Sequence, residues 1–374
     1  MSRWQWVQRT QPSRFWRFAS PLLALFLTVL LAMLLFVALG KDPWQGLQVF
    51  FWEPIKSGYA WGELLLKATP LLLIGLGLAL CFRSNVWNIG AEGQFIAGAI
   101  AAGSVALTAD ADTGRWIVLP ILLAGMAGGM AWAGIAAWLR DRFHASEILV
   151  SLMLVYVAEQ VLGWLVGGPL KDPMGYNFPQ SKTFEAATQI PLLFAGSRLH
   201  IGLLLVLVGL AVLWVFVFRT RAGFAQQVGG LAPAAARYAG FSSRSALWLA
   251  LLVSGGAAGL AGALEVAGPA GQLTLYIPAG YGFAAIIVAF VGRLHPVGVV
   301  FSSLLMSMLY IGGELAQSRL GLPKSISLVF QGLLLFILLA CDTLIAYQWQ
   351  RRSISAAPDE SNSLPAANVQ EQQA

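Results

Sequence analysis

The stretch CFRSNVWNIGAEGQFIAGAIAAG (Cys81–Gly103) places polar and charged residues between two long apolar segments. Within lipid, an unpaired polar or backbone group is unfavourable by several kcal/mol, so such a run persists only where neighbouring helices or a water-filled path cover it. A polar cluster inside a membrane-spanning region is a candidate functional site. The residues concerned are Arg83, Asn85, Asn88, Glu92 and Gln94, with Gly90, Gly93 and Gly98 among them.

The composition is that of an integral membrane protein. The chain has 374 residues, of which 58% are hydrophobic and only 11% charged, whereas soluble domains have about 25% charged residues. The two cysteines lie in apolar runs and the three histidines lie far apart, so neither a disulfide framework nor a metal site is expected. Arginines that flank membrane helices explain the net charge of +6, and nucleic-acid binding is not expected.

The hydropathy pattern predicts an all-α fold with about ten transmembrane helices, because each span needs about 20 mostly apolar residues. With a cytoplasmic N-terminus, the helices leave more than half of the 23 Lys and Arg on the cytoplasmic side, and the C-terminus returns there. The predicted helices cover 21–40, 62–82, 89–109, 115–139, 147–168, 200–218, 246–266, 280–292, 296–316 and 326–347, of which 280–292 is short.

Three regions follow from these spans: a cytoplasmic segment at 1–20, a transmembrane domain at 21–347, and a tail at 348–374. The tail is rich in Ala, Ser, Asn, Gln and Pro after Ser353, a composition typical of disorder.

The two halves of the transmembrane domain share a pattern. IGAEGQFIAGAIAA (89–102) resembles PAGYGFAAIIVAFV (278–291), and in each a glycine-containing step opens a helix of small residues. Five helices on each side of the 169–199 loop would give two halves of inverted topology, as in many transporters. Elsewhere, Gly125-x-x-x-Gly129 and Gly255-x-x-x-Gly259 predict close helix packing.

Most acidic residues in or near apolar runs lie close to helix ends, where a carboxylate is tolerated. Lys67 follows Glu63 by one helical turn, so we expect these two to pair. Glu92 and Glu265 differ because each lies inside a polar, glycine-rich break.

We expect these breaks to line or hinge a transport path. An alternative for Glu92 is a structural cap that holds its break in place. The residues assigned to the path or hinge are Asn85, Asn88, Gly90, Glu92, Gly93, Gln94 and Glu265.

The loop at 219–245 is too polar to span a membrane, and its segment APAAARYAG (232–240) predicts a short helix on the cytoplasmic face. Proline favours a first helical position, alanine continues a helix, and Gly240 can end it. The loop is either a simple connector or a docking helix that presents Arg237 and Tyr238 to a cytoplasmic partner. The residues assigned to docking are Gly229, Pro233, Ala235, Ala236, Arg237, Tyr238 and Gly240.

Motifs for catalysis are missing from the sequence. There is no Walker A phosphate loop, no Gly-x-Ser-x-Gly and no His-Glu-x-x-His. A membrane enzyme or scaffold is therefore disfavoured, and no cofactor is expected in this chain.

These segments resemble the permease subunits of ATP-binding-cassette (ABC) importers in the ribose/branched-chain-amino-acid permease superfamily. FRSNVWNIGAEGQ (82–94) is similar to the signature of the simple-sugar and nucleoside branch, which works with a Bmp-type lipoprotein. GGLAPAAARYAGF (229–241) is similar to the segment that docks on the ATPase. GLAGALEVAG (259–268) and GYGFAAIIVAFVGRLHPVG (280–298) also match, and the resemblance covers residues 60–340.

The resemblance implies a multi-pass subunit of a bacterial inner membrane that imports nucleosides or related simple sugars. It also implies three protein partners: a cytoplasmic ATPase that binds ATP and Mg, a second permease in a heterodimer, and an extracytoplasmic substrate-binding lipoprotein. One departure is Val155, which follows SEILVSLML (146–154) where the family usually has asparagine.

A second hypothesis remains open from the residues themselves: a proton- or ion-coupled secondary transporter, with Glu92 or Glu265 as the coupling carboxylate. Such a carrier would need no ATPase and would keep transporting after Arg237 and Tyr238 are changed.

Overall fold

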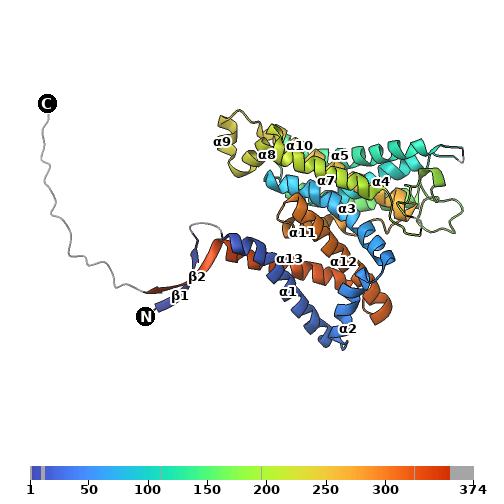
Figure 1. Ribbon diagram of the computed structural model, residues 1–374. Helices are drawn as coiled ribbons and strands as arrows, with labels where there is room; N and C mark the ends of the chain where they lie inside the picture. Colours follow the sequence, from blue (N-terminus) through green and yellow to red (C-terminus); the bar gives the residue numbers. More distant parts are fainter. Residues whose placement is uncertain (1, 10–12, 111, 195, 324, 354–374) are drawn as a thin grey trace, which may run out of the picture.

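The computed structural model describes residues 2–9, 13–110, 112–194, 196–323 and 325–353. It is a bundle of helices with one small sheet (Figure 1). The α-helices are α1 (Arg14–Ala38), α2 (Pro43–Leu47), α3 (Gly58–Arg83), α4 (Ala91–Ala106), α5 (Val118–Phe143), α6 (Glu147–Gly167), α7 (Gly202–Arg219), α8 (Arg221–Leu231), α9 (Pro233–Tyr238), α10 (Ser243–Glu265), α11 (Tyr281–Val291), α12 (Pro296–Leu320) and α13 (Ser325–Ala346).

Short turns of π or 3-10 helix complete the helical structure. They are η1 (Gln48–Trp52), η2 (Glu53–Ile55), η3 (Arg115–Ile117), η4 (Ala186–Thr188) and η5 (Val266–Ala270).

Eight of the described helices are long and apolar enough to cross a membrane, which confirms the all-α membrane class. The predicted spans at 89–109 and 280–292 are shorter: α4 has 16 residues and α11 has 11. At about 1.5 Å per residue, neither covers a hydrocarbon core of about 30 Å by itself. The ten predicted helices are therefore eight spanning helices and two half-helices, α4 and α11.

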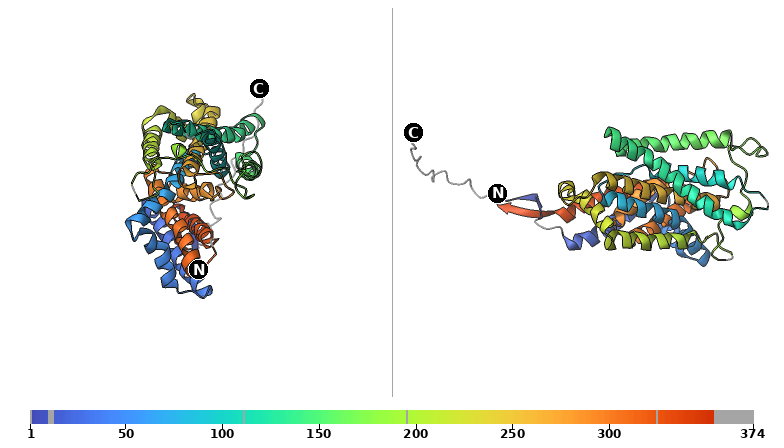
Figure 2. Two further views of the ribbon diagram at one scale, coloured as in Figure 1. Left: turned by 90° about the vertical axis from the view of Figure 1, so that its right-hand side faces the viewer. Right: turned by 90° about the horizontal axis from the view of Figure 1, so that it is seen from above.

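Strand β1 (Ser2–Gln8) pairs antiparallel with β2 (Tyr347–Ser353). The sheet brings the two ends of the described chain together, on the side of the bundle where α8 and α9 lie (Figures 1 and 2). Helix α1 begins at Arg14, inside the predicted segment 1–20, and residues 348–353 of the predicted tail belong to strand β2. Residues 354–374 of that tail lie outside the described chain.

We assign the face that carries the sheet to the cytoplasm, because the positive-inside pattern places the arginines of 1–20, 140–146 and 219–245 on this side. On this face Arg244, at the start of α10, pairs with Asp141 near the end of α5 at 2.8 Å. On the opposite face the long loop after α6 packs on the segment after α10 (Figure 1). There Ser181 N donates to Leu273 O at 2.9 Å.

Glycines bring the backbones of α4, α5 and α10 into contact. A Cβ built on Gly129 would lie 2.2 Å from Gly255 O and 2.6 Å from Gly259 Cα. A Cβ built on Gly98 would lie 2.2 Å from Gly259 Cα, and one on Gly259 would lie 2.2 Å from Gly125 O. The predicted close packing is confirmed, and it fixes α4 against two spanning helices.

Candidate functional site

The helical structure is interrupted between α3 and α4, over residues 84–90, a segment called the break below. Helix α3 ends at Arg83, and Asn85 then adopts a left-handed backbone with φ 53°. Asn85 is exposed, and its Oδ1 accepts a hydrogen bond from Trp87 Nε1 at 3.2 Å. It is thus the only one of the four polar side chains Asn85, Asn88, Glu92 and Gln94 that lies at the surface.

Asn88 and Gln94 form a buried amide pair that closes the break. Asn88 Nδ2 donates to Gln94 Oε1 at 2.9 Å, and Gln94 Nε2 donates to Asn88 Oδ1 at 3.0 Å. Asn88 also donates to Ser254 Oγ of α10 and accepts from the backbone N of Gly90. A network with its donors and acceptors paired in this way fixes one backbone geometry, so this pair holds the entry into α4.

Glu92 joins the two half-helices. Its buried carboxylate accepts hydrogen bonds from two backbone N–H groups at the start of α11: Gly280 N to Oε1 at 2.8 Å, and Gly282 N to Oε2 at 2.5 Å. Glu92 itself lies in the first turn of α4. One carboxylate therefore sits at the N-termini of two helices, where free N–H groups and the helix dipoles favour negative charge.

Two glycines allow this close approach. A Cβ on Gly282 would lie 2.1 Å from the backbone N of Glu92, so α11 could not begin there with any larger residue. A Cβ on Gly93 would lie 2.9 Å from Cα of Val155 on α6. Val155 is 1% exposed, so the residue that departs from the family pattern packs against α4 inside the protein.

Glu265 faces a different set of charges from Glu92: those of Lys67, Arg198 and Glu314. It is half-buried at the end of α10, and no hydrogen bond or ion pair joins it to Glu92 within the described residues. The structure therefore brings together Asn88, Gly90 and Gln94 in one network and Glu92 with α11, but it leaves Glu265 and Asn85 outside both groups.

A second polar group, missed in the sequence, lies beside the start of α11. Lys67 Nζ donates to Tyr281 Oη at 3.1 Å and lies 3.4 Å from Glu314 Oε1. The rings of Tyr281 and Tyr310 lie 5.4 Å apart. The predicted pair between Lys67 and Glu63 is wrong, because Glu63 pairs with Arg198 of the outer loop at 3.5 Å.

A lone lysine in an apolar run was the available signal for this group. Its partner could not be read from local spacing, because Glu314 and Tyr281 follow Lys67 by more than 200 residues.

The cytoplasmic loop contains the predicted short helix, α9, and also α8, which was not predicted. Gly240 has φ 82°, and Phe241 N donates to Ala236 O at 2.9 Å, which ends α9 as expected. Tyr238 is 97% exposed and Arg237 is exposed, whereas Ala236 is buried.

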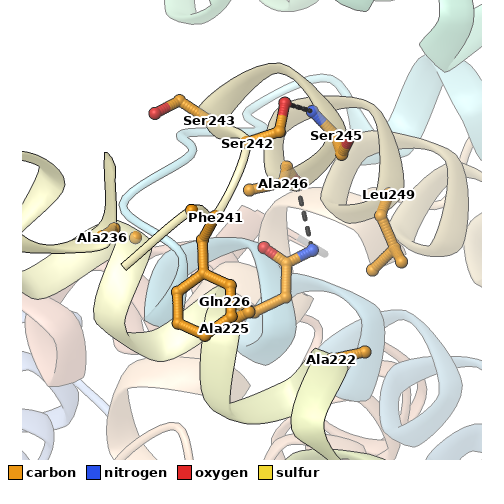
Figure 3. A pocket seen from close by; sticks show the side chains of 12 residues that line it. Ala222, Ala225, Gln226, Ala236, Phe241, Ser242, Ser243, Ser245, Ala246 and Leu249 are labelled. Atoms are coloured by element: carbon orange, nitrogen blue, oxygen red, sulfur yellow. Dashed lines mark hydrogen bonds between the residues drawn. The ribbon is translucent and has the colours of Figure 1, made fainter. Parts of the chain in front are cut away.

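A cavity of about 240 Å³ lies between α8, α9 and the start of α10 (Figure 3). Gln226 Nε2 donates to Ala246 O at 3.1 Å and so fastens α8 to α10. The cavity is lined by Ala222, Ala225, Gln226, Gly229, Ala236, Gly240, Phe241, Ser242, Ser243, Ser245, Ala246 and Leu249. Gly229, Ala236 and Gly240 belong to the predicted docking residues, so these three surround one depression at the cytoplasmic face.

Among the described residues, no group of three or more His, Cys, Asp or Glu could hold a metal ion. The arrangement offers two structural features. The half-helices α4 and α11 are joined at their N-termini by hydrogen bonds to Glu92, and the small helix α9 is exposed on the cytoplasmic face.

Comparisons with known proteins find a matching family and similar sequences. Residues 61–339 match the family described as branched-chain amino acid transport system / permease component. The glucose ABC transporter permease protein TsgB13 of Haloferax volcanii is 33% identical over 368 residues, which cover 94% of this chain and 96% of TsgB13.

Two nucleoside permeases are also similar. The guanosine ABC transporter permease protein NupP of Bacillus subtilis is 30% identical, covering 85% of this chain and 92% of NupP. The nucleoside ABC transporter permease protein NupB of Lactococcus lactis is 28% identical, covering 85% of this chain and 89% of NupB. No solved structure matches the chain.

Proposed function

This chain belongs to the family of permease components of ABC transport systems, and from that membership we propose that it forms one half of an importer for nucleosides or related simple sugars. The observation that carries the proposal is the similarity to TsgB13, which extends over 94% of this chain. Relatives named for glucose, guanosine and nucleosides support a substrate with a sugar ring. We place the protein in the bacterial inner membrane, as the family resemblance implies.

In this proposal, ATP and Mg bind to a separate cytoplasmic ATPase that docks on α9. Exposed Arg237 and Tyr238 on a short, well-capped helix support this contact. Closure of the ATPase pair on ATP then favours one of two arrangements of the permease, so that the path opens alternately to each side.

A second permease subunit and a substrate-binding lipoprotein complete the proposed importer. Two guanosine permease proteins of Bacillus subtilis, NupP and NupQ, are both similar to this chain, which supports a heterodimer. The lipoprotein would deliver substrate to the outer loops at 41–60, 110–114 and 169–199.

The arrangement around Glu92 favours ATP-driven over proton-driven transport. Both of its carboxylate oxygens accept backbone hydrogen bonds that hold α11 in place. Each protonation of a coupling carboxylate would weaken these hydrogen bonds, because the neutral acid is a poorer acceptor than the carboxylate. A structural cap keeps them.

Co-purification tests the proposal. We expect the tagged chain to bring an ATPase and a second permease with it from its native membrane, identified by mass spectrometry. Arg237→Glu should lower recovery of the ATPase by about tenfold or more, the change that about 1.4 kcal/mol of binding free energy produces.

Arg115→Glu is the matched control, because Arg115 is an exposed arginine on the opposite face. It should leave recovery of the ATPase unchanged. A chain that purifies alone and transports with a proton gradient would refute the importer and make Glu92 and Glu265 the residues to titrate.

A further inference from the structure

We propose that Arg83 is a positioning residue that transmits movement of the docking segment, α8 with α9, to both half-helices at once. The inference rests on the proposed function, since the movement comes from an ATPase docked on α9. Its basis is the set of contacts that meet at this one side chain.

Arg83 contacts three separate parts of the chain. Its Nε donates to Leu294 O at 2.7 Å, and its Nη1 donates to Gln227 Oε1 of α8 at 3.0 Å. Its guanidinium also lies 5.2 Å from the ring centroid of Phe218 near the end of α7. A guanidinium presents several donors in a fixed plane, so it can hold two acceptors in a fixed relation.

Arg83 is connected to both half-helices, to α4 through the chain and to the segment after α11 through a hydrogen bond. Arg83 is the last residue of α3, and the chain runs directly from it through the break into α4. Leu294 follows the end of α11 by three residues. The N-termini of α4 and α11 meet at Glu92. The chain ends that connect these half-helices to the cytoplasmic face therefore meet at Arg83.

The turn that contains Leu294 has a defined backbone. Arg293 and Leu294 have φ 58° and 54°, a left-handed conformation that is strained for side chains of this size. Surrounding contacts must hold such a turn. Arg83 binds the Leu294 carbonyl, and Asp342 of α13 pairs with Arg293 at 2.6 Å. A shift of Arg83 would release one of these two restraints.

Helix α8 also presses on the break through its backbone. A Cβ built on Gly230 would lie 2.6 Å from Arg83 O, 2.7 Å from Ser84 C and 2.9 Å from Asn85 N. Because these are backbone atoms in close contact, α8 cannot move toward the break without displacing it. The side-chain link between Gln227 and Arg83 resists movement in the opposite direction.

Hydrogen exchange of the intact complex tests this role. The complex is purified from its native membrane, and a non-hydrolysable ATP analogue is the probe. In the wild type we expect the analogue to change amide exchange at 84–94 and 278–282 by about threefold or more. Gln227→Leu should abolish that change, although the ATPase still protects 233–240. Arg83→Gln should do the same.

Gln317→Leu is the matched control, because Gln317 is exposed near the end of α12, and it should respond like the wild type. ATP hydrolysis should continue in Gln227→Leu while uptake of radiolabelled guanosine falls about tenfold, a split that a merely structural residue would not produce.

The outcomes separate the two proposals. Failure of the ATPase to protect 233–240 in the wild type would overturn the proposed docking surface. Protection there, with an unchanged nucleotide response at 278–282 in both variants, would overturn the role of Arg83 alone. Fast exchange at 84–94 without nucleotide in both variants would also overturn it, because Arg83 would then only stabilise the fold.

Discussion

Glu92→Gln is expected to lower the free energy of unfolding by about 3 kcal/mol and to abolish transport. Glutamine offers one acceptor oxygen, so its amide group would face the N–H of Gly280 or Gly282 as donor against donor. One buried N–H then loses its partner, which costs about 1–3 kcal/mol, and the other loses a charged acceptor. Thermal unfolding in detergent and uptake in vesicles measure the two effects.

Glu159→Gln is the control for this change. Glu159 is a half-buried carboxylate on α6, and in the described part of the chain it makes no side-chain hydrogen bond or ion pair. Its charge repels that of Glu92, so we expect Glu159→Gln to keep or slightly exceed the stability of the wild type. A Glu92→Gln protein that unfolds at the wild-type temperature would contradict the role of Glu92 as the joint between α4 and α11.

The second large effect is expected from Gly129→Ala. Its new methyl group would lie 2.2 Å from Gly255 O and 2.6 Å from Gly259 Cα, so α5 and α10 would have to separate. Overpacking of this kind costs about 1–3 kcal/mol, and because α4 packs on the same glycines, we expect the upper part of that range. The unfolding temperature in detergent and the yield of assembled transporter should both fall.

Gly134→Ala is a control within the same helix. Its methyl group would meet only Leu252 Cδ2, at 3.9 Å. We expect unchanged or slightly higher stability, because alanine favours a helix by about 1 kcal/mol over glycine. Equal stability of the two variants would show that the glycine contacts between α5 and α10 are looser than the structure has them.

These predictions assign separate tasks to the polar residues around the break between α3 and α4. The amide pair of Asn88 and Gln94 fixes the break, Glu92 joins the half-helices at their N-termini, and Arg83 links their cytoplasmic connections to α8. Because Asn88, Glu92 and Gln94 are buried in this arrangement, we propose that they act as a hinge. Contact with substrate would fall to groups nearer the surface, such as the ion pair of Lys67 with Glu314.

The sequence by itself determined the membrane class, the spanning segments and helix α9, because each of these depends on residues that are close together in the chain. Spans follow from the length of apolar runs, and α9 follows from a proline start, an alanine run and a glycine stop, all within nine residues. The glycine pairs on α5 and α10 were readable for the same reason, since four-residue spacing puts both on one helix face.

Only the tertiary structure decided which of these segments meet. Glu92 reaches Gly280 and Gly282 across 188 and 190 residues, and Lys67 reaches Tyr281 across 214. Local spacing predicted a Glu63–Lys67 pair instead, because residues one helical turn apart can form an ion pair. The partner that Lys67 has in the fold depends on which helices pack against α3. The shortness of α4 and α11 has the same cause: a half-helix is stable only where other helices bury its open end, and that burial is a property of the assembled fold.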